Sequence, residues 1–170
     1  MDARWDHVTT TPQLGRYEID TGNSWVTFMT RRVLGLVPAR GSLAIRTGTI
    51  DIAEPLTDSS LTVEFDSASL RTGSARWDRA MRSARYLDAD RHPVMTFVSQ
   101  RVERRAVHGM FTVGGVSRPV SVLIEDTDVT VGVFTAHAAA TLDRTEFGLS
   151  GRGIGARRLD VLLQLTCVHV

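Results

Sequence analysis

The side chains that could carry metal or redox chemistry are few and scattered. The sequence has five histidines: His7, His92, His108, His137 and His169. No two of them stand at a spacing that is typical of a zinc site. Cys167 is the only cysteine, which excludes an intrachain disulfide and a site with several cysteine ligands. The sequence therefore predicts neither a bound metal nor a cofactor.

Two glycine-rich stretches lack the residues that would make them catalytic or phosphate-binding. Ser150 stands in Gly-Leu-Ser-Gly-Arg, whereas a nucleophile elbow needs glycine at the position of Arg152. Residues 151–155 match neither a Walker loop nor a dinucleotide-binding fingerprint. The acidic residues Glu125, Asp126 and Asp128 lack the oxygen spacing of a calcium loop, and we interpret them as a hairpin tip. No catalytic residue is predicted, and we expect a protein that is not an enzyme.

All 20 basic residues of the chain are arginines. Four of them recur every three residues: Arg76, Arg79, Arg82 and Arg85. On a helix such a series turns around the axis, so it predicts a solvated face with ion pairs to Asp78 and Asp88. A sharper alternative is that Arg79 or Arg82 binds the anionic headgroup of a ligand. The net charge of +1 argues against a nucleic-acid partner.

Most of the chain alternates apolar and polar residues, which is typical of half-buried strands. The apolar positions are Val26, Phe28, Leu43, Ile45, Ile50, Ile52, Leu61, Val63, Phe65, Met95, Phe97, Phe111, Val113, Val120, Val122, Ile124, Ala136, Ala138, Ala140, Leu142, Leu159, Val161, Leu163, Leu165 and Cys167. They form about eight regularly spaced series, which favours an all-β sandwich or closed barrel. The alanine row at 136–140 indicates either room for a small ligand or close packing against another element.

One segment has helical spacing. Trp77, Met81 and Ala84 recur on one face over residues 74–87, with Ser74 as the predicted N-cap and Asp78 in the first turn. Residues 1–15 are polar and aperiodic, so we predict a flexible tail followed by a single domain over residues 16–170. No run approaches the length of a membrane span and the N-terminus lacks a signal-peptide pattern, so we expect a cytoplasmic protein unless a leader has been removed.

Four stretches carry a family resemblance in sequence order. They are Tyr17-Glu18-Ile19-Asp20 with Ser24-Trp25-Val26-Thr27-Phe28; Trp77-Asp78-Arg79-Ala80-Met81-Arg82-Ser83 with His92-Pro93-Val94-Met95-Thr96-Phe97; Gly109-Met110-Phe111-Thr112-Val113-Gly114-Gly115-Val116-Ser117-Arg118-Pro119-Val120; and Leu142-Asp143-Arg144-Thr145-Glu146-Phe147-Gly148. Together they resemble the signature of the YceI-like family, the bacterial polyisoprenoid-binding, lipocalin-like proteins. The chain departs from the family at Trp77 and Ala80, where the family has Arg and His, and at Arg32, where a His is common.

The resemblance implies an extended eight-stranded antiparallel lipocalin-like barrel with one short helix, at about residues 74–87, near its mouth. It also implies an apolar lumen that takes a long isoprenoid chain, such as a quinone tail or a polyprenyl phosphate, and no catalytic residues. The hypothesis is thus a non-catalytic carrier, store or sensor of an isoprenoid lipid. The predicted ligand-binding residues are Val26, Phe28, Leu61, Val63, Phe65, Trp77, Met81, Met95, Phe97, Phe111, Val113, Val122, Val161 and Leu163, with Arg79 and Arg82 as headgroup candidates.

Two alternatives stay open at this point. The chain could be a protein-interaction module with a filled barrel and an arginine-rich helix that contacts an acidic partner. It could instead be an enzyme that acts on an apolar substrate, which would need an inward-facing polar residue such as His137. The sequence also leaves open whether the barrel forms a homodimer.

Overall fold

The computed structural model describes residues 11–32, 37–149 and 156–170. One antiparallel sheet contains all of the strands: β1 (Gly15–Ile19), β2 (Trp25–Arg32), β3 (Val37–Leu43), β4 (Ile45–Ile52), β5 (Ser60–Asp66), β6 (Val94–Val102), β7 (Ala106–Val113), β8 (Val116–Thr130), β9 (Val133–Asp143) and β10 (Arg158–His169). Four 3-10 turns and the short helix α1 (Ala75–Arg82) connect them. No helix among these residues is long and apolar enough to span a membrane.

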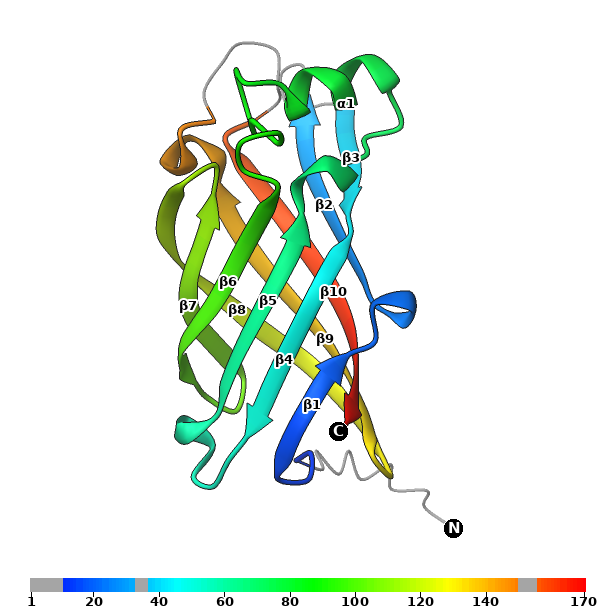
Figure 1. The fold of residues 1–170 in the computed structure, drawn as a ribbon, viewed down its shortest axis with the longest axis vertical. Coiled ribbons are helices and arrows are strands. Elements are labelled where there is room, and N and C mark those ends of the chain that lie inside the picture. Colours follow the sequence, from blue (N-terminus) through cyan, green and yellow to red (C-terminus); the bar gives the residue numbers. More distant parts are fainter. Residues whose placement is uncertain (1–10, 33–36, 150–155) are drawn as a thin grey trace.

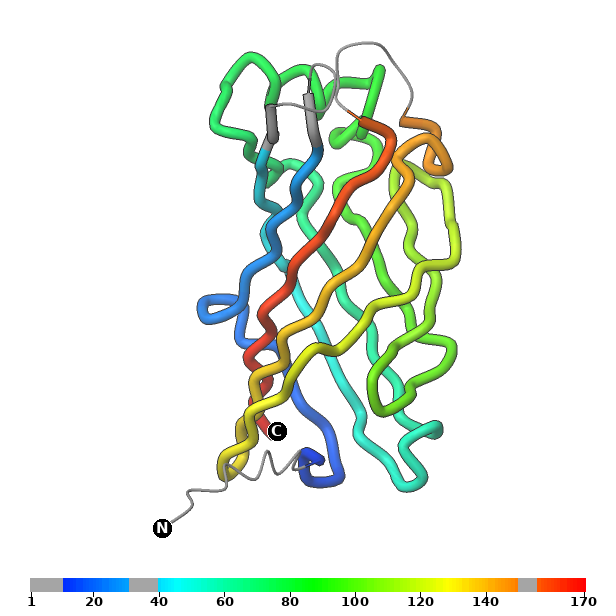
Figure 2. Tube along the Cα trace, turned by 180° about the vertical axis from the view of Figure 1, so that it is seen from behind, coloured from blue at the N-terminus to red at the C-terminus, as the bar shows by residue number. Residues whose placement is uncertain are grey.

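The sheet closes through β1, which pairs with β4 on one side and with β10 on the other. A 3-10 turn at Thr21–Asn23 separates β1 from β2, and Ala44 alone separates β3 from β4. Each pair therefore acts as one long, bent strand, and the ten segments make an eight-stranded barrel (Figures 1 and 2). The predicted fold, a lipocalin-like antiparallel barrel with one short helix, is confirmed.

The two ends of the barrel differ. The helix end contains α1 and the connections β5–β6, β7–β8 and β9–β10, whereas the base contains the connections β4–β5, β6–β7 and β8–β9 (Figure 1). Near the base, Tyr17 and Cys167 are fully buried, and the rings of Tyr17 and Phe134 meet edge to face at 4.8 Å. Residues 1–10 of the predicted tail lie outside the described part of the chain. In the part of this tail that the structure describes, the backbone carbonyl of Gln13 accepts a hydrogen bond from the Tyr17 hydroxyl at 2.9 Å.

Helix α1 starts where the sequence predicted but ends earlier. The Ser74 hydroxyl accepts a hydrogen bond from the Trp77 N–H at 3.4 Å, which confirms the N-cap. The predicted extension to Leu87 is wrong, because the chain turns after Arg82. The N–H groups of Leu87 and Ala89 fold back onto the carbonyls of Met81 and Arg82, at 3.0 Å each. This turn buries the Leu87 side chain, so tertiary packing outweighs the helical pattern of residues 83–87.

The acidic cluster does not form a hairpin tip. Glu125, Asp126 and Asp128 lie within β8, and the turn comes later, at residues 131–132, where Gly132 has a φ of 72°. A register shift between Ile124 and Asp126 places Asp126 opposite His137 of β9. The prediction failed because acidic side chains on the outer face of a long strand resemble a loop in composition.

Candidate ligand cavity

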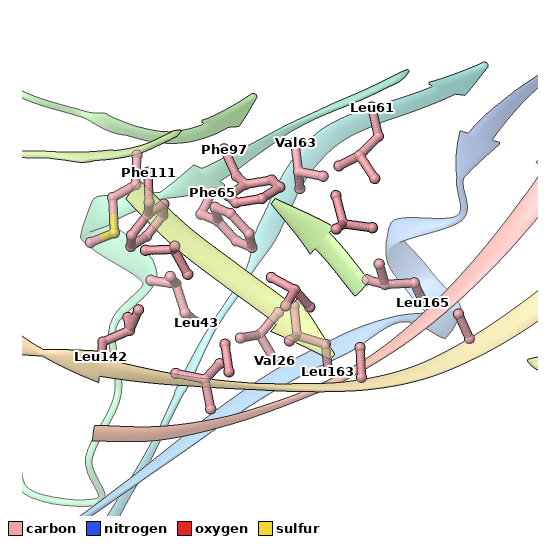
Figure 3. A pocket seen from close by; sticks show the side chains of 18 of the residues that line it. Val26, Leu43, Leu61, Val63, Phe65, Phe97, Phe111, Leu142, Leu163 and Leu165 are labelled. Carbon is pink, nitrogen blue, oxygen red and sulfur yellow. The ribbon is translucent and has the colours of Figure 1, made fainter. Parts of the chain in front are cut away.

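The barrel encloses a cavity of about 350 Å³. This volume lies within the usual range of small-molecule sites, roughly 300–1,000 Å³. Side chains from different sides of the barrel point into it: Phe65 of β5 lies across the space from Val26 of β2 and Leu163 of β10 (Figure 3). The lumen exists because alternate residues of each strand face inward, which is the period-two pattern of the sequence.

All fourteen predicted ligand-binding positions line this cavity. They are Val26, Phe28, Leu61, Val63, Phe65, Trp77, Met81, Met95, Phe97, Phe111, Val113, Val122, Val161 and Leu163. Twelve come from the strands, and Trp77 and Met81 come from α1 at the helix end. The structure therefore brings the predicted residues together around one apolar space. Whether they bind a ligand stays a prediction.

Large aromatic side chains line one part of the cavity, and alanines line another. Phe65, Phe111 and Phe147 form a chain of edge-to-face ring contacts, with centroids 6.0 and 5.6 Å apart. On β9, the inward positions Ala136 and Ala138 carry only methyl groups. The alanine row thus leaves room in the lumen, which decides between the two interpretations that the sequence left open.

A glycine allows one of the aromatic side chains to lie against the wall. Phe28 of β2 pairs with Gly41 of β3, and a Cβ atom on Gly41 would stand 2.3 Å from the Phe28 ring. Only a residue without a side chain lets the ring lie flat there. Gly41 therefore helps to set the shape of the lumen near the helix end.

Several lining residues were missed by sequence reasoning. They include Leu70, Leu87, Arg144, Phe147 and Leu149 at the helix end, and Ser59, Glu103 and Arg104 at the base. Most of them lie in turns, where no periodic pattern marks the inward face. For Arg144 and Phe147, the stretch that resembles the YceI-like family was the one feature of the sequence that could have marked them. The cavity thus extends toward both ends of the barrel, and its few polar lining groups gather there.

The two headgroup candidates do not line the cavity. Arg79 is exposed on α1. Arg82 is partly buried, and its Nη2 donates to the Leu70 carbonyl at 3.3 Å and lies 4.0 Å from the Asp78 carboxylate. Among the described residues, Arg144 is buried and lines the cavity, and its Nε donates to the Ala156 carbonyl at 3.1 Å.

Asp78 anchors the helix over the end of the barrel. Its buried carboxylate accepts hydrogen bonds from the N–H and the hydroxyl of Thr72, both at 2.7 Å. These bonds, chiefly the one from the Thr72 hydroxyl, with help from Arg82 and Arg71, hold the pKa of Asp78 below its ordinary value. Asp78 therefore fixes α1, and with it Trp77 and Met81, in place beside the cavity.

Two titratable side chains of the barrel wall, His137 and Cys167, face opposite sides of it. His137 faces outward, with Nδ1 2.6 Å from the Asp126 carboxylate and Nε2 3.0 Å from Gln164, and the hydrogen bond to Asp126 raises its pKa. Cys167 faces inward, and burial raises the pKa of its thiol to about 12. Within the described ranges, no three His, Cys, Asp or Glu side chains are grouped so that they could hold a metal ion.

The chain is similar in sequence to a family of bacterial proteins. A model described as YceI-like domain matches residues 17–167. A UPF0312 protein of Pseudomonas putida strain GB-1 is 33% identical over 123 residues, which are 66% of this chain and 64% of that protein. Another UPF0312 protein, from Pseudomonas syringae pv. syringae, is 32% identical over 125 residues, 68% of this chain and 65% of its own length. The chain thus spans less than two thirds of the length of these curated relatives.

Solved structures with the same fold are more distant in sequence. BcnA of Burkholderia cenocepacia superposes with a TM-score of 0.74 at 19% identity, covering 87% of this chain and 98% of BcnA. A polyisoprenoid binding domain from Saccharophagus degradans, implicated in plant cell wall breakdown, gives 0.72 at 12% identity and covers 93% and 100%. The YceI protein of Campylobacter jejuni gives 0.61 at 15% identity and covers 82% and 90%. At these identities the likeness shows a shared barrel.

Proposed function

We propose that this chain, which belongs to the YceI-like family, binds the apolar chain of an isoprenoid lipid in its barrel without transforming it. The observation that carries the proposal is the cavity itself, whose central lining consists of aliphatic and aromatic side chains. The name of one structural relative, a polyisoprenoid binding domain, points to the same class of ligand. Carriage, storage and sensing are all consistent with such binding.

The shape of the lumen favours a long ligand. Inward side chains of β9 line it from Phe134 to Leu142. At about 3.3 Å per residue and a tilt of roughly 40°, this stretch corresponds to a lumen of roughly 20 Å along the barrel axis. An extended chain of several isoprene units matches such a space better than a compact ligand does.

The chemistry of the lining favours an apolar ligand. Burial of each CH₂ group contributes about 0.8 kcal/mol, so several isoprene units supply enough free energy to offset the cost of association. A polar ligand would lose its bonds to water in the centre of the lumen, where aliphatic and aromatic side chains offer few replacements. Arg144, at the edge of the cavity, is better placed to meet an anionic headgroup than Arg79 or Arg82.

Neither alternative agrees as well with the described residues. A module with a filled barrel would leave no cavity, and a cavity is present. An enzyme of the kind considered needs a polar group deep in the lumen, and His137, the residue named for that role, is on the outer face. A location in the cytoplasm stays a prediction, as does a homodimer.

The proposal is tested by filling the lumen. We expect Ala138→Phe to lower the uptake of a fluorescent prenyl alcohol at least tenfold, because the ring would occupy space that the ligand needs. The matched control is Ala139→Phe, which adds the same ring to the next residue of β9. Ala139 pairs with Leu123 and with Leu162, both exposed on the outer face.

Titration of the probe fluorescence with each protein measures the effect. Ala140→Leu, a smaller change on the same inward row, serves if Ala138→Phe does not fold. Equal uptake by the two phenylalanine variants, with both folded as judged by circular dichroism, would place the probe outside the lumen and contradict the proposal.

A further inference from the structure

The helix end of the barrel carries an exposed, strongly basic surface that lipid binding in the lumen does not use. We define the helix-end basic surface by its exposed arginines, which lie in and around α1: Arg71, Arg76, Arg79, Arg85 and Arg91. Over residues 71–91 the exposed acidic residue is Asp90, because Asp78 is buried and Asp88 is partly buried. The exposed surface of residues 71–91 is therefore positive although the whole chain is close to neutral.

Few of these arginines are paired with a carboxylate among the described residues. Within the described part of the chain, no carboxylate lies within 4.0 Å of the guanidinium nitrogens of Arg76, Arg79 or Arg85. Arg91 lies 4.0 Å from Asp88 with most of its side chain exposed, and such a pair is weak in water. Of the series Arg76, Arg79, Arg82 and Arg85, whose pairing with Asp78 and Asp88 was predicted, Arg82 pairs with Asp78 at 4.0 Å. The charge is available to an anionic partner.

The basic surface adjoins the cavity. Trp77 and Met81, which line the lumen, lie in α1 between Arg76 and Arg85. Arg157 and Arg158, near the start of β10, are exposed at the same end of the barrel but are paired with Asp143 and Asp160, and the exposed Glu146 also lies in the β9–β10 connection. The base is different, because there the exposed arginines, such as Arg101, stand among the exposed carboxylates Glu54, Asp58, Asp126 and Asp128.

We propose that the helix end docks on an anionic lipid bilayer, so that α1, with the cavity-lining Trp77 and Met81, faces the membrane from which the apolar ligand enters or leaves. This inference rests on the proposed function. Each basic residue near an anionic bilayer contributes about a fivefold gain in affinity, and five of them form one surface here. An acidic protein would satisfy the charge equally, but it offers no apolar phase to a ligand that leaves the lumen beside Trp77.

The charge asymmetry also orients the molecule. An anionic surface attracts the helix end more than the base, where positive and negative side chains are mixed. The barrel therefore approaches with α1 first. The partly exposed ring of Trp77 then lies at the interface, where tryptophan side chains are favoured. The structure thus assigns one end of the barrel to the membrane and the other to water.

The test is sedimentation with lipid vesicles. We expect the wild-type protein to bind phosphatidylcholine vesicles that contain phosphatidylglycerol, to bind pure phosphatidylcholine vesicles far more weakly, and to be released by salt. The variant Arg76→Gln, Arg85→Gln, Arg91→Gln should lose about a hundredfold in affinity for the anionic vesicles. Its matched control removes three exposed arginines outside the helix end: Arg16→Gln, Arg101→Gln, Arg105→Gln.

Each outcome has a definite meaning. The inference is overturned if the control loses as much affinity as the helix-end variant, because net charge alone would then explain binding. It is also overturned if the wild type ignores anionic vesicles, or if it binds polyglutamate as tightly as it binds them. Prenyl alcohol uptake, measured without vesicles, separates the two proposals: uptake without vesicle binding overturns only docking, and a wild type that takes up no probe overturns the proposed function.

Discussion

Single side chains in this barrel take their properties from the side of the wall that they face. Ala138 and Ala139 are neighbours with the same side chain, yet one lines the cavity and the other faces outward. His137 and Cys167 differ in the same way: the outward imidazole pairs with Asp126, whereas the inward thiol is surrounded by apolar groups. The sequence predicted these orientations from alternation alone. It could not predict Arg144 as a lining residue, because a turn has no such period.

The burial of Cys167 has a measurable consequence. Only the thiolate attacks a disulfide reagent, and a pKa of about 12 instead of 9.0 lowers the thiolate fraction at pH 8 about a thousandfold. We therefore expect Ellman's reagent to react with the native protein about a thousandfold more slowly than with the urea-unfolded protein.

The matched control moves the thiol to the outer face. Cys167→Ser combined with Thr62→Cys carries one exposed thiol on β5, which should react at nearly the same rate before and after unfolding. A native wild-type rate within tenfold of the unfolded rate would mean that Cys167 is accessible to solvent, against the structure.

At the scale of secondary structure, strands were easier to predict than their ends and the helix. Alternation marked the strands because an inward apolar face is required along the whole length of a barrel strand. The bend between β1 and β2 depends on Asp20, whose carboxylate accepts hydrogen bonds from the Gly22 N–H at 3.1 Å and from Asn23 Nδ2 at 2.8 Å. The end of α1 depends on Leu87, which packs into the barrel. Neither contact follows from the spacing of apolar residues along the sequence, so neither could be predicted from it.

The anchoring of α1 should depend on pH. The folded pKa of Asp78 is depressed, so its contribution to stability is present above the unfolded pKa and is lost as the pH falls through the folded pKa. We expect wild type to resist urea better than Asp78→Asn at pH 7, and the two unfolding midpoints to converge at a pH below the folded pKa.

Asp90→Asn is the control for a nearby exposed carboxylate. It should change the midpoint little at either pH. The difference in unfolding midpoint between wild type and Asp78→Asn could instead persist unchanged under acidic conditions. That result would show that the shape of the Asp78 side chain, and not its charge, fixes the helix.

The whole molecule combines an apolar lumen with an asymmetric distribution of surface charge. Closure of the sheet by β1 leaves a lumen that alanines on β9 keep open and phenylalanines on β5 and β7 line. The basic surface lies at one end of this lumen. The sequence predicted the barrel and the residues that line it, but not this asymmetry of surface charge. The arginines form one surface only because α1 lies at the end of the barrel.

The central claim, that the lumen holds an isoprenoid chain, is tested most directly by solvent extraction of protein purified from bacteria, followed by mass spectrometry. The wild type should yield a prenyl lipid in an amount approaching that of the protein, and Ala138→Phe should yield at least tenfold less. If the wild type carries no prenyl lipid, or if both proteins carry the same amount, the lumen is not the binding site that we propose.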